Sequence, residues 1–164
     1  MKGLITLCAL AATAATVFAA DEAPQPPLGK AADNHIYAQT LVNSIMAEHS
    51  ELVVIGLHAT ATGSKDERMI ATNLDRIGKI DDDDDIAVCT ERKTILAPNL
   101  KDDTRFEVQV PLMDAQGRIV GSTGLVFKYH AGDDELELHR KALAIRAELA
   151  KQIPDHDSLF KPTS

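Results

Sequence analysis

Apolar and polar positions recur along the chain in patterns that change from helical to extended and back. Segment 32–52 carries apolar residues at helical spacing, which predicts an amphipathic helix with Asp33 or Asn34 as its N-cap. Residues 51–63 then form a run rich in β-branched and small residues, and residues 68–73 form a second, shorter one. Both runs predict strands, separated by a polar loop.

The second half of the chain continues the series with one short helix, three strands and one long helix. These elements are expected over residues 84–92, 93–98, 104–113, 118–130 and 132–154. Strict alternation in the second of the three strands predicts a half-buried antiparallel strand. The third is more continuously apolar, as in a central strand, and Gly121 and Gly124 leave room there for another element to approach closely. Asp133 and Asp134 open the last helix.

The element order α–β–β–α–β–β–β–α predicts the α+β class. We expect an antiparallel sheet of about five strands, flanked by N-terminal and C-terminal helices. Ahead of it, Lys2 precedes an apolar stretch, and Val17 and Ala19 complete a small-residue cleavage pattern, so residues 1–19 are predicted to be a signal peptide. Residues 20–31 are expected to be a disordered Pro-rich leader, and residues 32–160 a single domain in the periplasm or outside the cell.

Charge and cysteine content exclude several classes of partner and stabiliser. The chain has a net charge of −8, and loss of one lysine with the signal peptide makes it −9. Nucleic acid is therefore not expected as a partner, because phosphate binding needs clustered Lys and Arg. Only Cys89 would survive processing, so no internal disulfide is available, and we interpret Cys89 as a small residue of the apolar face.

No catalytic motif or cofactor signature is present, so we predict no enzyme and no cofactor. The chain lacks G-x-S-x-G, H-E-x-x-H, P-loop and C-x-x-C patterns. An EF-hand loop beginning at Asp81 fails because Ile86 replaces the required Gly and Arg92 the required Glu. No metal ligand is therefore assigned, and the run Asp81–Asp85 is interpreted as a helix cap with cations at the other end. A weak cation site there is left open, because capping does not need five acids.

Two stretches carry a resemblance to a known family. "MIATNLDRIGKIDDDDDIAV" leads from a strand through an Ile-Gly-Lys loop into an acid-capped helix, and "RFEVQVPLMDAQGRIVGSTGLVF" is a hairpin around a D-x-x-G turn. Over residues 33–153 the chain resembles extracytoplasmic PAS-like sensor domains of the Cache (PDC) class. The resemblance implies a long helix on one face of the sheet and a small-molecule pocket on the other, under the loops and the short helix.

The resemblance also implies a function. Cache domains bind small metabolites, and a carboxylate is the candidate here, since the absence of Trp removes the aromatic motif used for amino acids. The chain shows no membrane helix and no output module, so we expect a freestanding binding domain with a membrane-bound signalling or transport partner. The candidate ligand-binding residues are His58, Thr72, Asn73, Arg76, Arg105 and Tyr129.

Two alternative functions remain open at this point. One is a hydrolase or isomerase that uses His58 with an acid such as Asp75. The other is an interaction module that presents an acidic surface. A defined pocket with His58 in hydrogen-bond reach of a carboxylate would favour the enzyme, and a broad exposed apolar patch without a pocket would favour the module.

Overall fold

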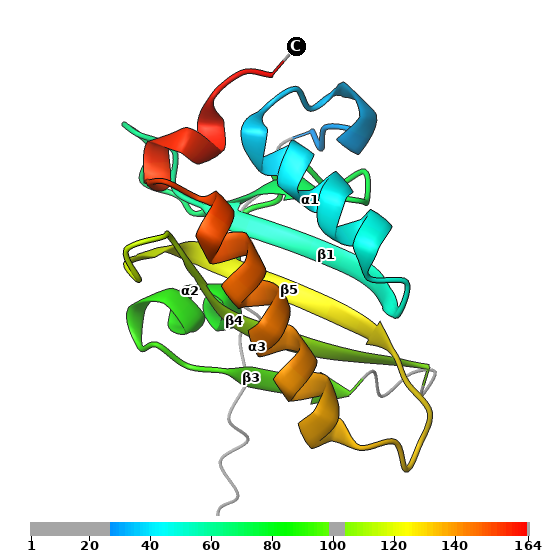
Figure 1. Ribbon diagram of the computed structural model, residues 1–164. Coiled ribbons are helices and arrows are strands. Elements are labelled where there is room, and N and C mark those ends of the chain that lie inside the picture. Colours follow the sequence, from blue (N-terminus) through cyan, green and yellow to red (C-terminus); the bar gives the residue numbers. More distant parts are fainter. Residues whose placement is uncertain (1–26, 99–103, 164) are drawn as a thin grey trace, which may run out of the picture.

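A computed structural model describes residues 27–98 and 104–163 as one sheet covered by helices (Figure 1). The elements in chain order are η1 (Ala31–Asp33), α1 (Tyr37–Glu48), β1 (Leu52–Ala59), β2 (Arg68–Thr72), α2 (Asp83–Thr90), β3 (Ile95–Pro98), β4 (Arg105–Met113), β5 (Ile119–Lys128), α3 (Glu135–Gln152) and η2 (His156–Phe160). The five strands pair antiparallel in the order β2-β1-β5-β4-β3. The predicted fold class and element order are confirmed.

The hydrophobic core lies between the sheet and the helices α1 and α3, which cross the same face (Figure 1). Alternation along β4 sends Phe106, Val108 and Val110 into this core, and each is fully buried. The stripe of α3, with Ile145 and Leu149, packs against them. A large side chain buried in this way contributes about 1.5–3 kcal/mol. A charge in place of Val110 would lose this contribution and would also be buried without a partner, which is far more costly.

The alternate residues of the central strands project from the opposite face of the sheet. On β1 these include Gly56 and His58, and on β4 they include Glu107 and Gln109. The short helix α2 contacts β4 and β5 and covers part of this face. The sheet therefore has one face packed into the core and one polar face beneath α2.

Gly121 and Gly124 occupy close approaches on β5, as their sequence positions predicted. A Cβ atom added to Gly121 would lie 1.9 Å from the His58 carbonyl oxygen, and one added to Gly124 would lie 2.9 Å from Glu107 Oε1. Gly121 thus allows the backbones of β1 and β5 to meet beside His58. This contact fixes the strand that carries the histidine.

The predicted N-cap of the first helix is wrong. Helix α1 begins at Tyr37, and Ile36 stands at its N-cap without a side-chain cap. The Tyr37 amide instead donates to the carbonyl oxygen of Lys161 at 2.8 Å, so the C-terminal segment satisfies this end. Asn34 is used elsewhere, because its side-chain amide donates to Gln39 Oε1 and to the Ile70 carbonyl.

The aspartate-rich helix is capped as predicted at its start and differs at its end. Asp82 is the N-cap, and its carboxylate accepts the Asp85 amide at 3.3 Å. The last turn of α2, which lies wholly in the described part of the chain, contains no basic residue. Arg92 lies beyond the C-cap with a φ of 56°. The expected cations are therefore not in the last turn, because the helix ends at Thr90, two residues before Arg92.

The predicted signal peptide, residues 1–19, lies outside the described residues. From position 27 the predicted leader is described, and Gly29 pairs with Ile77 through two backbone hydrogen bonds of 2.8 and 3.1 Å. Part of the segment predicted to be a disordered leader, at Gly29, therefore pairs with the domain. Within residues 27–98 and 104–163, no helix combines the length and apolar character needed to cross a bilayer.

Candidate functional site

A cavity of about 490 Å³ lies on the polar face of the sheet, which is the face that the Cache resemblance indicated. Its volume falls within the range of small-molecule sites, about 300–1,000 Å³. Strands β1, β4 and β5 form its floor, and α2 and the segment before it form one wall. It is lined by Val54, Gly56, His58, Met69, Leu74, Arg76, Lys79, Asp82, Asp85, Ala97, Pro98, Arg105, Glu107, Gln109, Gly124 and Val126.

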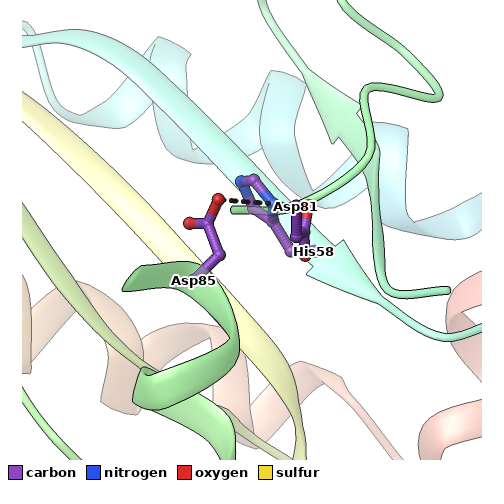
Figure 2. Close-up of side chains that lie close together, drawn as sticks. All are labelled: His58, Asp81 and Asp85. Carbon is purple, nitrogen blue, oxygen red and sulfur yellow. Dashed lines mark hydrogen bonds and ion pairs between the residues drawn. The ribbon is translucent and has the colours of Figure 1, made fainter. Parts of the chain in front are cut away.

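A histidine and two carboxylates meet at this cavity (Figure 2). His58 Nδ1 lies 2.6 Å from Asp81 Oδ1 and 3.8 Å from Asp85 Oδ2. All three side chains are at most 5% exposed. His58 and Asp85 line the cavity, whereas Asp81 lies behind them. We call these three residues the His-Asp-Asp cluster.

The fold brings the cluster together from three elements. His58 lies near the end of β1, opposite Met69 of β2 and Ser122 of β5. Asp81 follows the isolated bridge between Arg68 and Ile80, and its amide donates to the Glu67 carbonyl oxygen at 3.2 Å. Because Asp82 caps α2, Asp85 falls one helical turn inside it and faces the sheet. The cap thus sets the position of the second carboxylate.

Burial and mutual charge shift the protonation of this cluster. Burial by itself would lower the pKa of His58, but the hydrogen bond to Asp81 and the charges of Asp81 and Asp85 raise it above its ordinary value. Burial raises the pKa of Asp85 to about 6; the charge of His58 opposes this rise, and those of Asp81 and Asp82 add to it. His58 therefore holds a proton more strongly than a free imidazole, and Asp85 ionises only near neutral pH.

Several polar atoms beside the cluster have no hydrogen-bond partner among the residues described. They include Asp81 Oδ2 and Gln109 Oε1, both buried. The Gln109 amide nitrogen does reach Asp85 Oδ1 and Glu107 Oε1, each at 3.4 Å. A buried oxygen without a partner costs about 1–3 kcal/mol, more when it carries charge. Two buried oxygens at or beside the cluster can therefore still accept a hydrogen bond or bind a cation.

The structure brings three of the six predicted ligand-binding residues to the cavity. His58 stands at its floor, and Arg76 and Arg105 lie at its exposed rim. Neither guanidinium forms a hydrogen bond or ion pair with any residue in the described ranges. These two cations are therefore available to a bound molecule.

The other three predicted residues do not line this cavity. Thr72 is fully buried, and its hydroxyl accepts the Leu74 amide at 3.3 Å. Asn73 bonds the backbone of β1, donating to the Val53 carbonyl and accepting from the Ile55 amide. Tyr129 packs on Phe106 with ring centroids 5.3 Å apart, and its hydroxyl donates to Glu135 at 3.0 Å. Each of these side chains is occupied by structural contacts.

The acid suggested as a partner for His58 was wrong. Asp75 is exposed, lies outside the cavity lining, and accepts the Ala31 amide at 3.3 Å. The partner is Asp81, 23 residues from His58 in the chain. The interpretation of Asp81 and Asp85 as parts of the helix cap is wrong, because the cap is Asp82 alone. Asp81 precedes this N-cap, so helical spacing does not relate it to Asp85, and local sequence gave no signal for the cluster.

Cys89 lies next to the cluster and is half-buried. Its thiol donates to Glu67 Oε1 at 3.0 Å. Burial and the neighbouring Glu67 carboxylate raise the pKa of the thiol well above its ordinary range. Cys89 is thus a hydrogen-bonded thiol at neutral pH rather than a thiolate nucleophile.

Comparison with known proteins finds similarity in solved structures alone. No protein-family model matches the chain, and no curated protein matches it. The fold is similar to a protein from Burkholderia vietnamiensis described as a GAF sensor, with 12% identity and a TM-score of 0.49, over 73% of this chain and 75% of that one. It is also similar to the C-terminal domain of the Escherichia coli transcriptional regulator KdgR, with 13% identity and a TM-score of 0.46, over 74% of this chain and 96% of that one. A further structure, of a GAF domain, is 12% identical to this chain with a TM-score of 0.44, over 74% of this chain and 81% of that one. The function is therefore argued from the site itself.

Proposed function

We propose that this domain binds a small organic acid in the cavity on the polar face of the sheet, as a sensor-like binding domain without catalysis. The observation that carries the proposal is the cavity of about 490 Å³ with His58 at its floor and, at its rim, two guanidiniums that no described residue pairs. A site for a small molecule needs an apolar cleft with a few fixed polar groups, and Val54, Leu74 and Val126 supply the apolar part.

The protonation of His58 supports an anionic group on the ligand. Nδ1 is bonded to Asp81, so Nε2 is the ring nitrogen left for the cavity. The raised pKa of His58 favours the form in which Nε2 carries a proton and can donate it to an anion. A Cβ atom on Gly56 would lie 3.0 Å from Nε2, so the glycine keeps space open beside this nitrogen. A carboxylate there would accept a charge-assisted hydrogen bond.

The rim supplies the remaining charge complementarity. Arg76, Arg105 and Lys79 line the cavity together with Asp82 and Glu107. A ligand that carries a carboxylate and a hydroxyl or amine satisfies this mixed lining better than a purely anionic one. We therefore expect hydroxy acids or short polar carboxylates to bind better than inorganic anions.

Thermal-shift screening of residues 20–164 against small organic acids, followed by calorimetric titration, tests this proposal. Arg105→Ala and His58→Gln are expected to weaken binding by about tenfold each, as loss of a charge-assisted hydrogen bond implies. Arg92→Ala is the matched control, because Arg92 is exposed and lies outside the cavity lining. Equal affinity in all four proteins would place the ligand elsewhere and refute the proposal.

We further propose that the protein works in the periplasm or is secreted, and that its partner is membrane-bound. The support is the signal-like pattern of residues 1–19 and the net charge, which disfavours nucleic acid and anionic membranes. N-terminal sequencing of the protein from fractionated cells should begin at Ala20. Recovery of the uncleaved chain in the cytoplasmic fraction would contradict the proposal.

A second candidate function is general acid–base catalysis by His58. The specific observation is the 2.6 Å contact between its Nδ1 and Asp81, with the ring at the cavity floor. This is the arrangement that the sequence analysis named as favouring an enzyme. This arrangement orients an imidazole as in His-Asp pairs of hydrolases. The raised pKa of His58 favours an acid or an anion anchor over a base at neutral pH. Turnover of ester or isomerisable substrates that is abolished by His58→Gln would select this candidate over the first.

A further inference from the structure

We propose that His58, Asp81 and Asp85 form a site for a divalent transition-metal cation at the floor of the cavity. Each residue offers one ligand atom, and all three atoms lie within 4.8 Å of one another. The site goes beyond organic-acid binding and does not depend on it. Figure 2 shows the three side chains converging from β1, from the segment before α2 and from α2 itself.

The spacing of the donors is close to what a metal requires. Metal–nitrogen and metal–oxygen bonds of about 2.1 Å place neighbouring donor atoms about 3.0–3.5 Å apart. The two contacts to His58 Nδ1, at 2.6 and 3.8 Å, bracket this range. A cation would displace the proton shared between His58 and Asp81, and each donor would move by about 0.5 Å to reach such bond lengths. Nε2–H of His58 would stay free for a ligand.

Independent support comes from Asp81, whose side chain is fully buried. Its Oδ2 atom has no hydrogen-bond partner among the described residues. A buried carboxylate normally accepts several hydrogen bonds, and an unused oxygen is costly. The other oxygen of the same carboxylate, Oδ1, contacts His58 Nδ1 at 2.6 Å, so the unpartnered group belongs to a residue of the cluster. A cation bound by Asp81 would neutralise its carboxylate and so reduce the cost of leaving Oδ2 without a hydrogen bond.

The charges around the cluster are unbalanced in favour of a cation. Asp81 and Asp85 face His58, with Asp82 and Glu67 close enough to act on the same groups. Lys79 is a further cation that acts on both His58 and Asp85. A divalent cation would neutralise the two buried carboxylates directly.

The donor set selects the class of metal. One imidazole nitrogen with two carboxylates suits Zn²⁺, Mn²⁺, Fe²⁺ or Co²⁺, whereas Ca²⁺ and Mg²⁺ prefer oxygen alone. Three protein ligands leave further coordination positions, and His58 and Asp85 both line the cavity. Those positions therefore face the cavity, as in metal sites that keep an exchangeable position.

The test uses tag-free residues 20–164, stripped with chelator and dialysed, then titrated with Zn²⁺ by calorimetry and with Co²⁺ by visible absorption. We expect one ion per chain and Co²⁺ bands in the visible range. His58→Gln and Asp85→Asn should weaken binding by at least about tenfold, the lower range seen even for second-shell changes. The Asp83→Asn, Asp84→Asn double variant is the matched control, because both residues are exposed members of the same run.

Circular dichroism of each variant separates loss of metal from loss of fold. Absence of Zn²⁺ or Co²⁺ binding by the folded wild-type protein would overturn the proposal. So would binding that persists in His58→Gln, or a response confined to Ca²⁺. Titration of an organic acid in the presence of chelator tests the proposed function separately, so failure of one does not imply failure of the other.

Discussion

Replacement of Gly121 by alanine is expected to be among the most destabilising single changes in this protein. The added Cβ would lie 1.9 Å from the His58 carbonyl oxygen, whereas carbon and oxygen in contact stay about 3 Å apart or more. Strands β1 and β5 would have to separate locally by about 1 Å, which lengthens hydrogen bonds of about 2.9 Å beyond their useful range. Two lost bonds at about 1 kcal/mol each, with overpacking strain of about 1–3 kcal/mol, give about 3–5 kcal/mol.

Gly124→Ala provides the matched comparison on the same strand. Its Cβ would meet Glu107 Oε1 at 2.9 Å, and that carboxylate is the end of a flexible side chain that can rotate away. We expect a loss below about 1 kcal/mol. Urea unfolding followed by circular dichroism measures both variants against wild type. The reasoning is refuted if Gly121→Ala unfolds within 1 kcal/mol of wild type, or if the two variants are equally unstable.

Three further changes test separate parts of the structure. Asp134→Ala removes the N-cap of α3, which accepts the amides of Leu136 and Glu137, and should lower the free energy of unfolding by about 1 kcal/mol in urea titrations. Burial opposes ionisation of Asp114, but hydrogen bonds from Arg118 and Gln116 outweigh it and lower the pKa of this carboxyl. The ionised Asp114 should therefore stabilise the fold above about pH 4, and this stabilisation should fade as the pH falls below that value. Asp114→Asn should make the Tm less dependent on pH in this acid range. Cys89 should react with iodoacetamide far more slowly in the folded protein than in urea, and equal rates would contradict its assignment as a protonated, hydrogen-bonded thiol.

The order and approximate bounds of the helices and strands could be predicted because they depend on local periodicity. Alternation along Arg105–Met113 identified the buried face of β4, and Asp134 marked the start of α3 as expected. The start of α1 could not be predicted from capping chemistry, since a carbonyl from Lys161, more than 120 residues away, performs that role. Local sequence carries no information about such a partner.

The candidate site was predictable in part for the same reason. His58 could be chosen because it ends an apolar strand, and strand alternation decides which face it occupies. The structural role of Asn73 could not be predicted, because its hydrogen bonds to the backbone of β1 depend on how β1 packs beside the end of β2. Asp81 could not be paired with His58, because the contact joins β1 to a segment 23 residues later through tertiary structure alone.

The five consecutive aspartates are best understood by their positions rather than their number. Asp82 performs the capping role, and Asp83 and Asp84 are exposed members of the first turn of α2. Asp81 and Asp85 are instead buried against His58, where capping gains nothing and burial of each charge costs several kcal/mol. A sequence under selection for stability alone would replace them with apolar residues of similar size, which is often neutral or stabilising. Asp85 lines the cavity and Asp81 lies behind it, so the pair argues for a positive charge that the two carboxylates bind. One imidazolium at His58 would balance only one of them.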